Sequence, residues 1–181
     1  MADFDDQPEL NGKRLCLRPM QAADRAGLFA AASDPATWEQ HPADDRWRPE
    51  AFDPYFDVLL DAGGTLVARA GDAIIGCSRF YPVPDHPGDI GIGFTFLAPS
   101  HWGGGWNREM KALMLAHAFR HFDRVWFHIA PGNLRSQIAT TRLGAVFRYD
   151  AELDLGTGSS LTKCYVMTPD SWRDATGQAL V

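Results

Sequence analysis

The sequence has few cysteines, and their distribution excludes two common uses. Its 181 residues include three cysteines, Cys16, Cys77 and Cys164, which lie far apart in apolar or strand-like segments. An odd number at such distances indicates neither a disulfide framework nor a CxxC metal site, so no metal is expected as a cofactor. We interpret all three as reduced packing residues.

Long apolar runs and excess positive charge are also missing. No apolar run approaches the roughly 18 residues of a membrane span, and residues 1–9 are acidic where a signal peptide would be basic and then apolar. We therefore expect a cytoplasmic protein with no membrane partner. The net charge of −6 argues against nucleic acid as a partner, which would need clustered lysine and arginine, and it leaves room for a cationic substrate.

No linker, repeat or low-complexity tract divides the chain. The 12 prolines and 17 glycines are spread along it, and 45% hydrophobic with 22% charged residues is ordinary for one folded domain. We expect a single domain over residues 1–181, with a core at about 13–169 and both termini as loose tails.

Hydrophobic periodicity predicts an alternation of strands and helices. Strands are predicted at 13–18, 65–70, 73–81, 90–97, 124–129, 145–153 and 161–167, and helices at 24–32, 50–60, 107–122 and 134–143. Gly71-Asp72 predicts a hairpin between the second and third strands. Helix 107–122 has a broad apolar face, and we expect Arg108, Lys111 and Arg120 to remain in water.

Two further glycine patterns stand out. Gly91 and Gly93 lie inside strand 90–97, where glycine marks a bulge or a close approach to the backbone. The triplet 103–105 joins that strand to helix 107–122 and leaves backbone amides uncovered at the positive end of a helix dipole. Such a turn can hold a phosphate-bearing cofactor, although an isolated triplet is more often a flexible connection.

Two phosphate-binding motifs are excluded by the residues that follow this turn. A dinucleotide fingerprint would need its third glycine at Arg108, and a P-loop would need Gly-Lys-Ser/Thr where Trp106-Asn107-Arg108 stands. NAD and ATP are therefore disfavoured as ligands.

Three groups of residues, in this order and spacing, resemble a known family. They are Leu15-x-Leu17-Arg18-Pro19 with Ala23-Asp24, then Trp102-Gly-Gly-Gly-Trp106-Asn107-x-Glu109, then Asn133-x-x-Ser136 followed by Leu143-Gly144-Ala145. Over about residues 15–169 the chain resembles the GNAT acetyltransferases, and within them the branch of ribosomal-protein N-terminal (alanine/serine) acetyltransferases. The resemblance implies an α/β (α+β) fold with a mixed, mostly antiparallel sheet of six to seven strands, a splayed central pair, and about four flanking helices.

The resemblance also implies an activity and a donor. It implies transfer of an acetyl group from the cosubstrate acetyl-CoA to a primary amine by direct attack, the acceptor being a protein N-terminus or a small amine. The cofactor-binding residues that it implies are Phe96, Leu97, Trp102, Gly103, Gly104, Gly105, Trp106, Asn107, Arg108, Asn133, Arg135 and Ser136. Ser136 would be the catalytic acid that protonates the departing CoA thiolate.

Local sequence leaves plainer interpretations open for several of these residues. Asn133 also fits a helix N-cap and Ser136 an ordinary early-helix residue. Arg108 and Arg135 also fit solvated surface positions, and the two tryptophans of the glycine turn fit packing roles.

A general base is not evident. Strand 90–97 contains no carboxylate, and Asp89, Asp150, Glu152 and His128 are the neighbouring candidates. This absence motivates a second hypothesis, an acyl-CoA-binding domain of weak catalytic activity that acts as a sensor or interaction module. The acceptor cleft is expected at residues 33–54, 82–89 and the last hairpin, in a monomer or homodimer.

Overall fold

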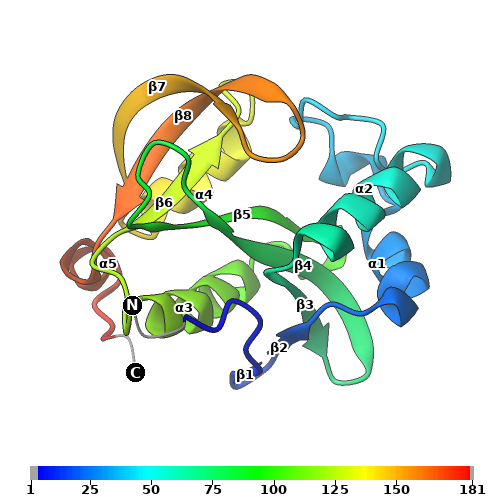
Figure 1. The fold of residues 1–181 in the computed structure, drawn as a ribbon. Coiled ribbons are helices and arrows are strands. Elements are labelled where there is room, and N and C mark those ends of the chain that lie inside the picture. The colour runs from blue at the N-terminus through cyan, green and yellow to red at the C-terminus, as the bar shows by residue number, and fades with distance from the viewer. Residues whose placement is uncertain (1–3, 180–181) are drawn as a thin grey trace.

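The computed structural model describes residues 4–179 and contains one eight-stranded sheet with helices on both faces (Figure 1). The strands are β1 (Leu10–Asn11), β2 (Cys16–Pro19), β3 (Thr65–Ala70), β4 (Ala73–Pro82), β5 (Ile90–Leu97), β6 (Val125–Ile129), β7 (Val146–Asp154) and β8 (Ser159–Met167). The α-helices are α1 (Arg25–Ala32), α2 (Pro49–Ala62), α3 (Trp106–Ala118), α4 (Leu134–Arg142) and α5 (Pro169–Thr176).

The strand order is β1-β2-β3-β4-β5-β6-β8-β7, and every neighbouring pair is antiparallel except β5 and β6. This confirms the expected mixed, mostly antiparallel sheet. The short β1 and the terminal α5 raise the strand count above the six to seven and the helix count above the four that were expected. The hairpin predicted at Gly71-Asp72 is present, with Ala70 paired to Ala73 across the turn.

The sheet separates two apolar layers because side chains alternate along each strand. Leu66 of β3 points into the layer beneath α3, whereas its neighbour Val67 points into the layer covered by α1 and α2. Figure 1 shows α3 on one side of β3 and β4, and α1 with α2 on the other. A ligand that lies between two strands of this sheet therefore meets α3 from one face and the α1–α2 region from the other.

The expectation of loose termini is wrong at both ends. Residues 169–176 form α5, whose Trp172 is fully buried. The side chain of Thr168 caps the helix in a capping box with Ser171. At the other end Phe4 packs edge-on against Phe80 and Phe122. Each terminus offers a single aromatic residue in a polar segment, which gives no periodic signal, so only the tertiary packing reveals its burial.

Cys16, Cys77 and Cys164 are free thiols, and the last two are fully buried in the sheet, as expected of packing residues. Among residues 4–179 there is no helix whose length and apolarity would let it cross a bilayer.

Candidate active site

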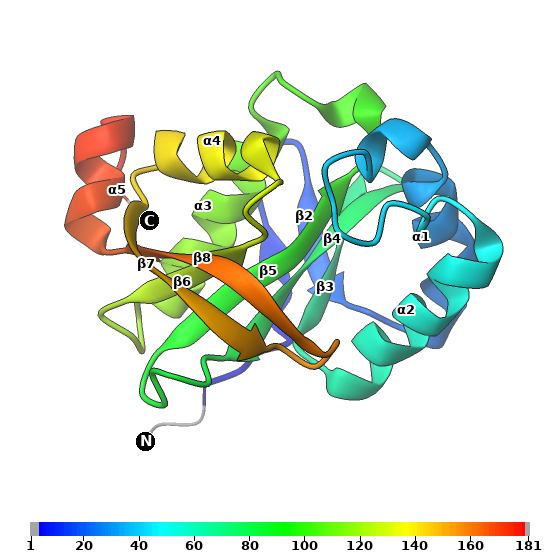
Figure 2. The same cartoon turned by 90° about the horizontal axis from the view of Figure 1, so that it is seen from above.

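The central feature of the candidate site is the separation of β5 from β6. These parallel strands pair only at Ile90 with Val125 and at Gly91 with Trp126, after which they diverge. From Ile92 to Leu97, β5 pairs with β4 except at Phe94 and Thr95, and within residues 4–179 no strand lies on its other edge, so an extended ligand can hydrogen-bond there. Figure 2 shows β5 crossing the middle of the sheet, with α4 above it. The splayed pair implied by the resemblance is therefore present.

A bulge interrupts β5 along this open edge. The register with β4 shifts between Cys77 and Arg79, and Phe94 has φ of 52°, the only left-handed non-glycine residue among those described. A bulge re-aims the backbone and side chains of the strand that carries it. Here it exposes Thr95 while the following residue, Phe96, is buried in the layer beneath α1 and α2.

Tyr81 explains the two glycines inside β5. A Cβ at Gly91 or Gly93 would collide with the Tyr81 ring, so the close approach inferred from these glycines is confirmed. The Tyr81 hydroxyl lies 2.8 Å from Nδ1 of His128 on β6, and the Nε2 atom of His128 is buried without a partner. Burial lowers the pKa of His128 to about 4, so its imidazole is neutral at pH 7.

The glycine turn has a geometry that only glycine adopts readily. Gly103, Gly104 and Gly105 have φ of 72°, 55° and 84°, all in the left-handed region. Gly105 is the N-cap of α3, and no side chain caps this helix. Nothing approaches a Cβ built at Gly103, so the conformation and not crowding requires glycine here. The turn thus presents first-turn amides without a side-chain acceptor, which is how helix N-termini bind phosphate.

Arg14, which the sequence did not single out, holds the turn against α3. Its guanidinium donates to the Gly104 carbonyl at 2.7 Å, pairs with Glu109 at 2.8 Å and stacks on the Trp106 ring at 4.6 Å. Burial opposes ionisation of Glu109, but the hydrogen bonds from Arg14 outweigh it and hold the pKa of that carboxyl below its usual value. Arg14 precedes β2, so its proximity to residue 104 follows from the fold alone.

Trp102 and Arg135 form a cluster beside the end of β5. The indole N–H of Trp102 donates to the Leu97 carbonyl at 2.8 Å, and the Arg135 guanidinium stacks on the indole at 4.2 Å. Arg135 also donates to the carbonyls of Ala36 and Thr37 at 3.1 and 2.8 Å. Trp102 and Arg135 therefore connect α4 and the 3-10 turn Pro35–Thr37 to the end of β5. Arg108 is not part of this cluster and is exposed.

Asn133 and Ser136 lie at the start of α4. The Asn133 side-chain oxygen accepts from the Ser136 backbone amide at 3.0 Å, so Asn133 is the N-cap, as the plainer interpretation had it. This bond leaves the Asn133 amide nitrogen available as a donor. The Ser136 hydroxyl is half-buried, and no hydrogen bond engages it among the described residues.

Lys111 contradicts the expectation that it stays in water, because it is only 5% exposed. Its Nζ donates to Ser78 Oγ at 2.9 Å and to Thr95 Oγ1 at 2.6 Å. The sequence did carry the signal: Lys111 stands three, four and seven residues before the buried Met114, Leu115 and Ala118, which places all four on one helix face. We expected exposure because lysine is charged, although its spacing matched the buried face of the helix.

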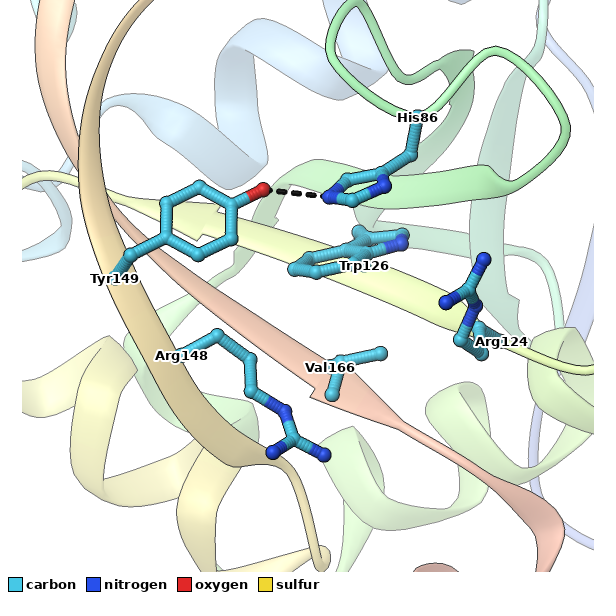
Figure 3. A pocket seen from close by; sticks show the side chains of 6 residues that line it. All are labelled: His86, Arg124, Trp126, Arg148, Tyr149 and Val166. Carbon is cyan, nitrogen blue, oxygen red and sulfur yellow. Dashed lines mark hydrogen bonds between the residues drawn. The ribbon is translucent and has the colours of Figure 1, made fainter.

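A separate cavity of about 310 Å³ lies at the other end of β6. Figure 3 shows it lined by His86, Arg124, Trp126, Arg148, Tyr149 and Val166. His86 stacks on Trp126 at 4.1 Å and hydrogen-bonds the Tyr149 hydroxyl at 2.6 Å. The cavity lies partly in the region expected to hold the acceptor, because His86 belongs to residues 82–89 and Tyr149 to the last hairpin.

Two acidic residues beside this cavity already have partners. Asp89 pairs with Arg124 at 3.0 Å and accepts from the Trp126 indole at 2.8 Å. Asp85 accepts from the Tyr149 hydroxyl at 2.6 Å. Trp38, which lies in the expected cleft region, and Tyr81, which directly precedes its segment 82–89, are both buried in the core.

One family model matches this chain, and many solved structures have a similar fold. The model of the acetyltransferase (GNAT) domain matches residues 14–146. A proposed acetyltransferase from T. thermophilus is 25% identical, with a TM-score of 0.74 over 98% of this chain and 96% of that chain. A GCN5-related N-acetyltransferase from Brucella melitensis is 18% identical, with a TM-score of 0.76 over 97% and 85%.

A third similar structure carries a ligand. Mycobacterium smegmatis RimJ, in complex with CoA-disulfide, is 17% identical, with a TM-score of 0.66 over 92% of this chain and 85% of that chain. No curated protein matches the chain by sequence.

Proposed function

Because the chain belongs to the GNAT acetyltransferase family, we propose that it transfers an acetyl group from acetyl-CoA to a primary amine by direct attack. The observation that carries this proposal is the open edge of β5, which ends beside the uncapped N-terminus of α3. An extended arm with amide groups fits the strand edge and a diphosphate fits the helix N-terminus, and coenzyme A has both.

The donor is proposed to bind along this edge and turn. The amides of the arm lie along the edge of β5 that β6 leaves open, near Phe96 and Leu97, as in β-strand addition. The amides of Gly103, Gly104 and Gly105 then face the diphosphate, together with those of Trp106, Asn107 and Arg108 in the first turn of α3. The exposed Arg108 guanidinium adds a cation. Trp102 and Arg135 support the edge through the Leu97 carbonyl.

The chemistry requires a neutral amine, a polarised carbonyl and a protonated leaving group. Ser136 is proposed to donate its unengaged hydroxyl proton toward the departing CoA sulfur, with Asn133 fixing the first turn of α4 and offering its amide to the arm. The amine reaches the thioester at the open edge of β5.

The acceptor is proposed to be a protein N-terminus or a small amine. The resemblance to ribosomal-protein N-terminal acetyltransferases favours the first. The net charge of −6 is compatible with either, because both acceptors are cations before they react.

Two measurements test this function in sequence. Calorimetric titration with acetyl-CoA should show saturable binding, and release of CoA thiol should then depend on an amine from a panel of peptides with free alanine or serine N-termini and polyamines. Ser136→Ala should lower kcat, whereas Thr141→Ala, which removes an exposed hydroxyl from the same helix, should not. Failure of acetyl-CoA to bind would reject the proposal.

A second candidate is an acyl-CoA-binding domain without efficient turnover. The observation that favours it is the absence of any carboxylate from β5, Ile90–Leu97. Tight acetyl-CoA binding with no amine-dependent CoA release across the panel would select this alternative.

A further inference from the structure

Lys111, Ser78 and Thr95 form a hydrogen-bonded triangle of which the first two members are buried. The lysine Nζ donates to both hydroxyls, and the two hydroxyl oxygens are 2.7 Å apart. The three residues come from α3, β4 and β5, so the triangle spans the helix and the two strands beside the splay. Ser78 is fully buried, whereas Thr95 is exposed.

The fold gains little from the charge of this lysine. Among residues 4–179, no carboxylate pairs with Nζ, and an ammonium buried without a counter-ion is costly. Burial accordingly lowers the pKa of Lys111 to about 7, so the neutral amine is well populated at neutral pH. An unbranched apolar residue of similar length would cost less, which makes a purely structural role a poor explanation.

None of the groups that face Nζ is ionised, and two of them are hydroxyls that can exchange a proton with it. From β4 the titratable neighbour is Cys77, whose thiol pKa burial raises to about 12, so it is uncharged. From β6 the neighbour is the Phe127 ring, whose centroid is 6.0 Å from Nζ. Ser78 and Thr95 are the remaining polar contacts, and both hydroxyls can donate as well as accept.

Thr95 connects this buried amine to the open edge. It is the exposed residue of β5 in the bulged stretch that follows Phe94, past the point where β6 has left the strand. The Thr95 hydroxyl therefore contacts the buried Nζ atom, while the residue itself is exposed where β5 and β6 have separated.

We propose that Lys111, acting through the Thr95 hydroxyl, accepts the proton that the acceptor amine loses during acetyl transfer. This inference rests on the proposed function and supplies the base that β5 lacks. Lys111 is the positioning residue that stores the proton, and Thr95 is the group that meets the amine.

The proton transfers balance without a further reactant. As the amine nitrogen bonds to the thioester carbonyl carbon, it gives a proton to Thr95 Oγ1, and the Thr95 hydroxyl proton moves to Nζ, which becomes an ammonium. When the C–S bond breaks, its electron pair stays on sulfur. The Ser136 hydroxyl protonates this sulfur, and the ammonium returns one proton through Thr95 and water to the Ser136 oxygen, so the products are an amide and the free thiol of CoA.

The test compares Thr95→Val, Lys111→Met and Lys111→Arg with the control Lys163→Met, which removes a lysine that pairs with Asp150 on β7. For each variant, acetyl-CoA affinity, thermal unfolding and the pH profile of kcat/KM are measured with the amine found in the panel. We expect Thr95→Val and both Lys111 variants to lose at least tenfold in kcat/KM and to lose the rise near pH 7, with affinity changed less than twofold. Unchanged kcat/KM and pH profile in Thr95→Val and Lys111→Met would overturn the inference.

A second readout needs no acceptor. In the wild type with and without acetyl-CoA, NMR of the lysine side chains should show one amine that titrates near pH 7 and is missing from Lys111→Met. A Lys111 that titrates at its ordinary pKa of 10.5 overturns the inference even if the enzyme is active. If acetyl-CoA does not bind the wild type, the proposed function fails instead, so the two failures are distinguishable.

Discussion

The glycine turn offers a controlled test of where the donor binds, because the chain contains a matched glycine elsewhere. Gly104 in the turn has φ of 55°, and Gly71 in the β3–β4 hairpin has φ of 58°. Neither has an obstacle to a Cβ: the nearest atom at residue 104 is in ordinary contact at 3.6 Å, and nothing lies near residue 71. Gly104→Ala and Gly71→Ala therefore impose the same backbone penalty at two different places.

The size of the effect follows from the left-handed conformation. A residue with a Cβ costs roughly 1–2 kcal/mol there, so Gly71→Ala, whose paired hairpin holds the turn, should lose about that much unfolding free energy. In Gly104→Ala the free turn can relax toward negative φ, and binding must then restore the strained geometry. If that full penalty falls on binding, the affinity for acetyl-CoA drops by roughly fivefold to thirtyfold, since about 1.4 kcal/mol is tenfold.

Two assays separate stability from binding. Urea unfolding should show a smaller loss in Gly104→Ala than in Gly71→Ala, whereas calorimetric titration should show weaker acetyl-CoA binding in Gly104→Ala alone. Equal stability losses with wild-type affinity in both variants would refute the reasoning, because the amides of the turn would then not meet the ligand.

Contacts elsewhere in the fold lead to four more expected outcomes. Trp172→Ala should destabilise the protein by about 3–5 kcal/mol in urea unfolding, since it empties a fully buried site beneath α5; a loss below about 1 kcal/mol would mean that α5 is not docked. Gly91→Ala should cost about 1–3 kcal/mol by displacing the Tyr81 ring, while Gly88→Ala, which has open space, should be neutral. Arg14→Gln should weaken acetyl-CoA binding, because it removes the guanidinium that holds the glycine turn and packs on Trp106. High salt should weaken binding to the wild type less than this substitution does, because salt screens the charge of Arg14 and leaves its packing in place. Because burial lowers the folded-state pKa of His128 to about 4, its contribution to stability is complete above its ordinary value of 6.5 and is lost as the pH falls toward 4. His128→Gln should flatten the fall of unfolding free energy across that window, and an unchanged slope would contradict the buried neutral state.

Local sequence determined most of the elements. Hydrophobic periodicity predicted the strands β3, β4 and β5. The dipeptide Gly71-Asp72 predicted the hairpin between β3 and β4, because tight hairpin turns need residues that adopt positive φ. The glycine triplet predicted a turn with uncovered backbone amides, and the structure then showed that all three residues are left-handed. The order of motifs then sufficed to indicate the family, which the match to residues 14–146 confirms.

Tertiary structure decided which of these residues meet. Arg14 reaches Gly104 across 90 positions of chain, and Tyr81 reaches His128 across 47, contacts that no local pattern encodes. Trp172 looked like part of a tail because one aromatic residue gives no period, yet it is fully buried. Lys111 shows the division most clearly: the sequence led to the wrong expectation that it stays in water, and only the folded sheet supplies the hydroxyls of Ser78 and Thr95 that let an amine remain buried.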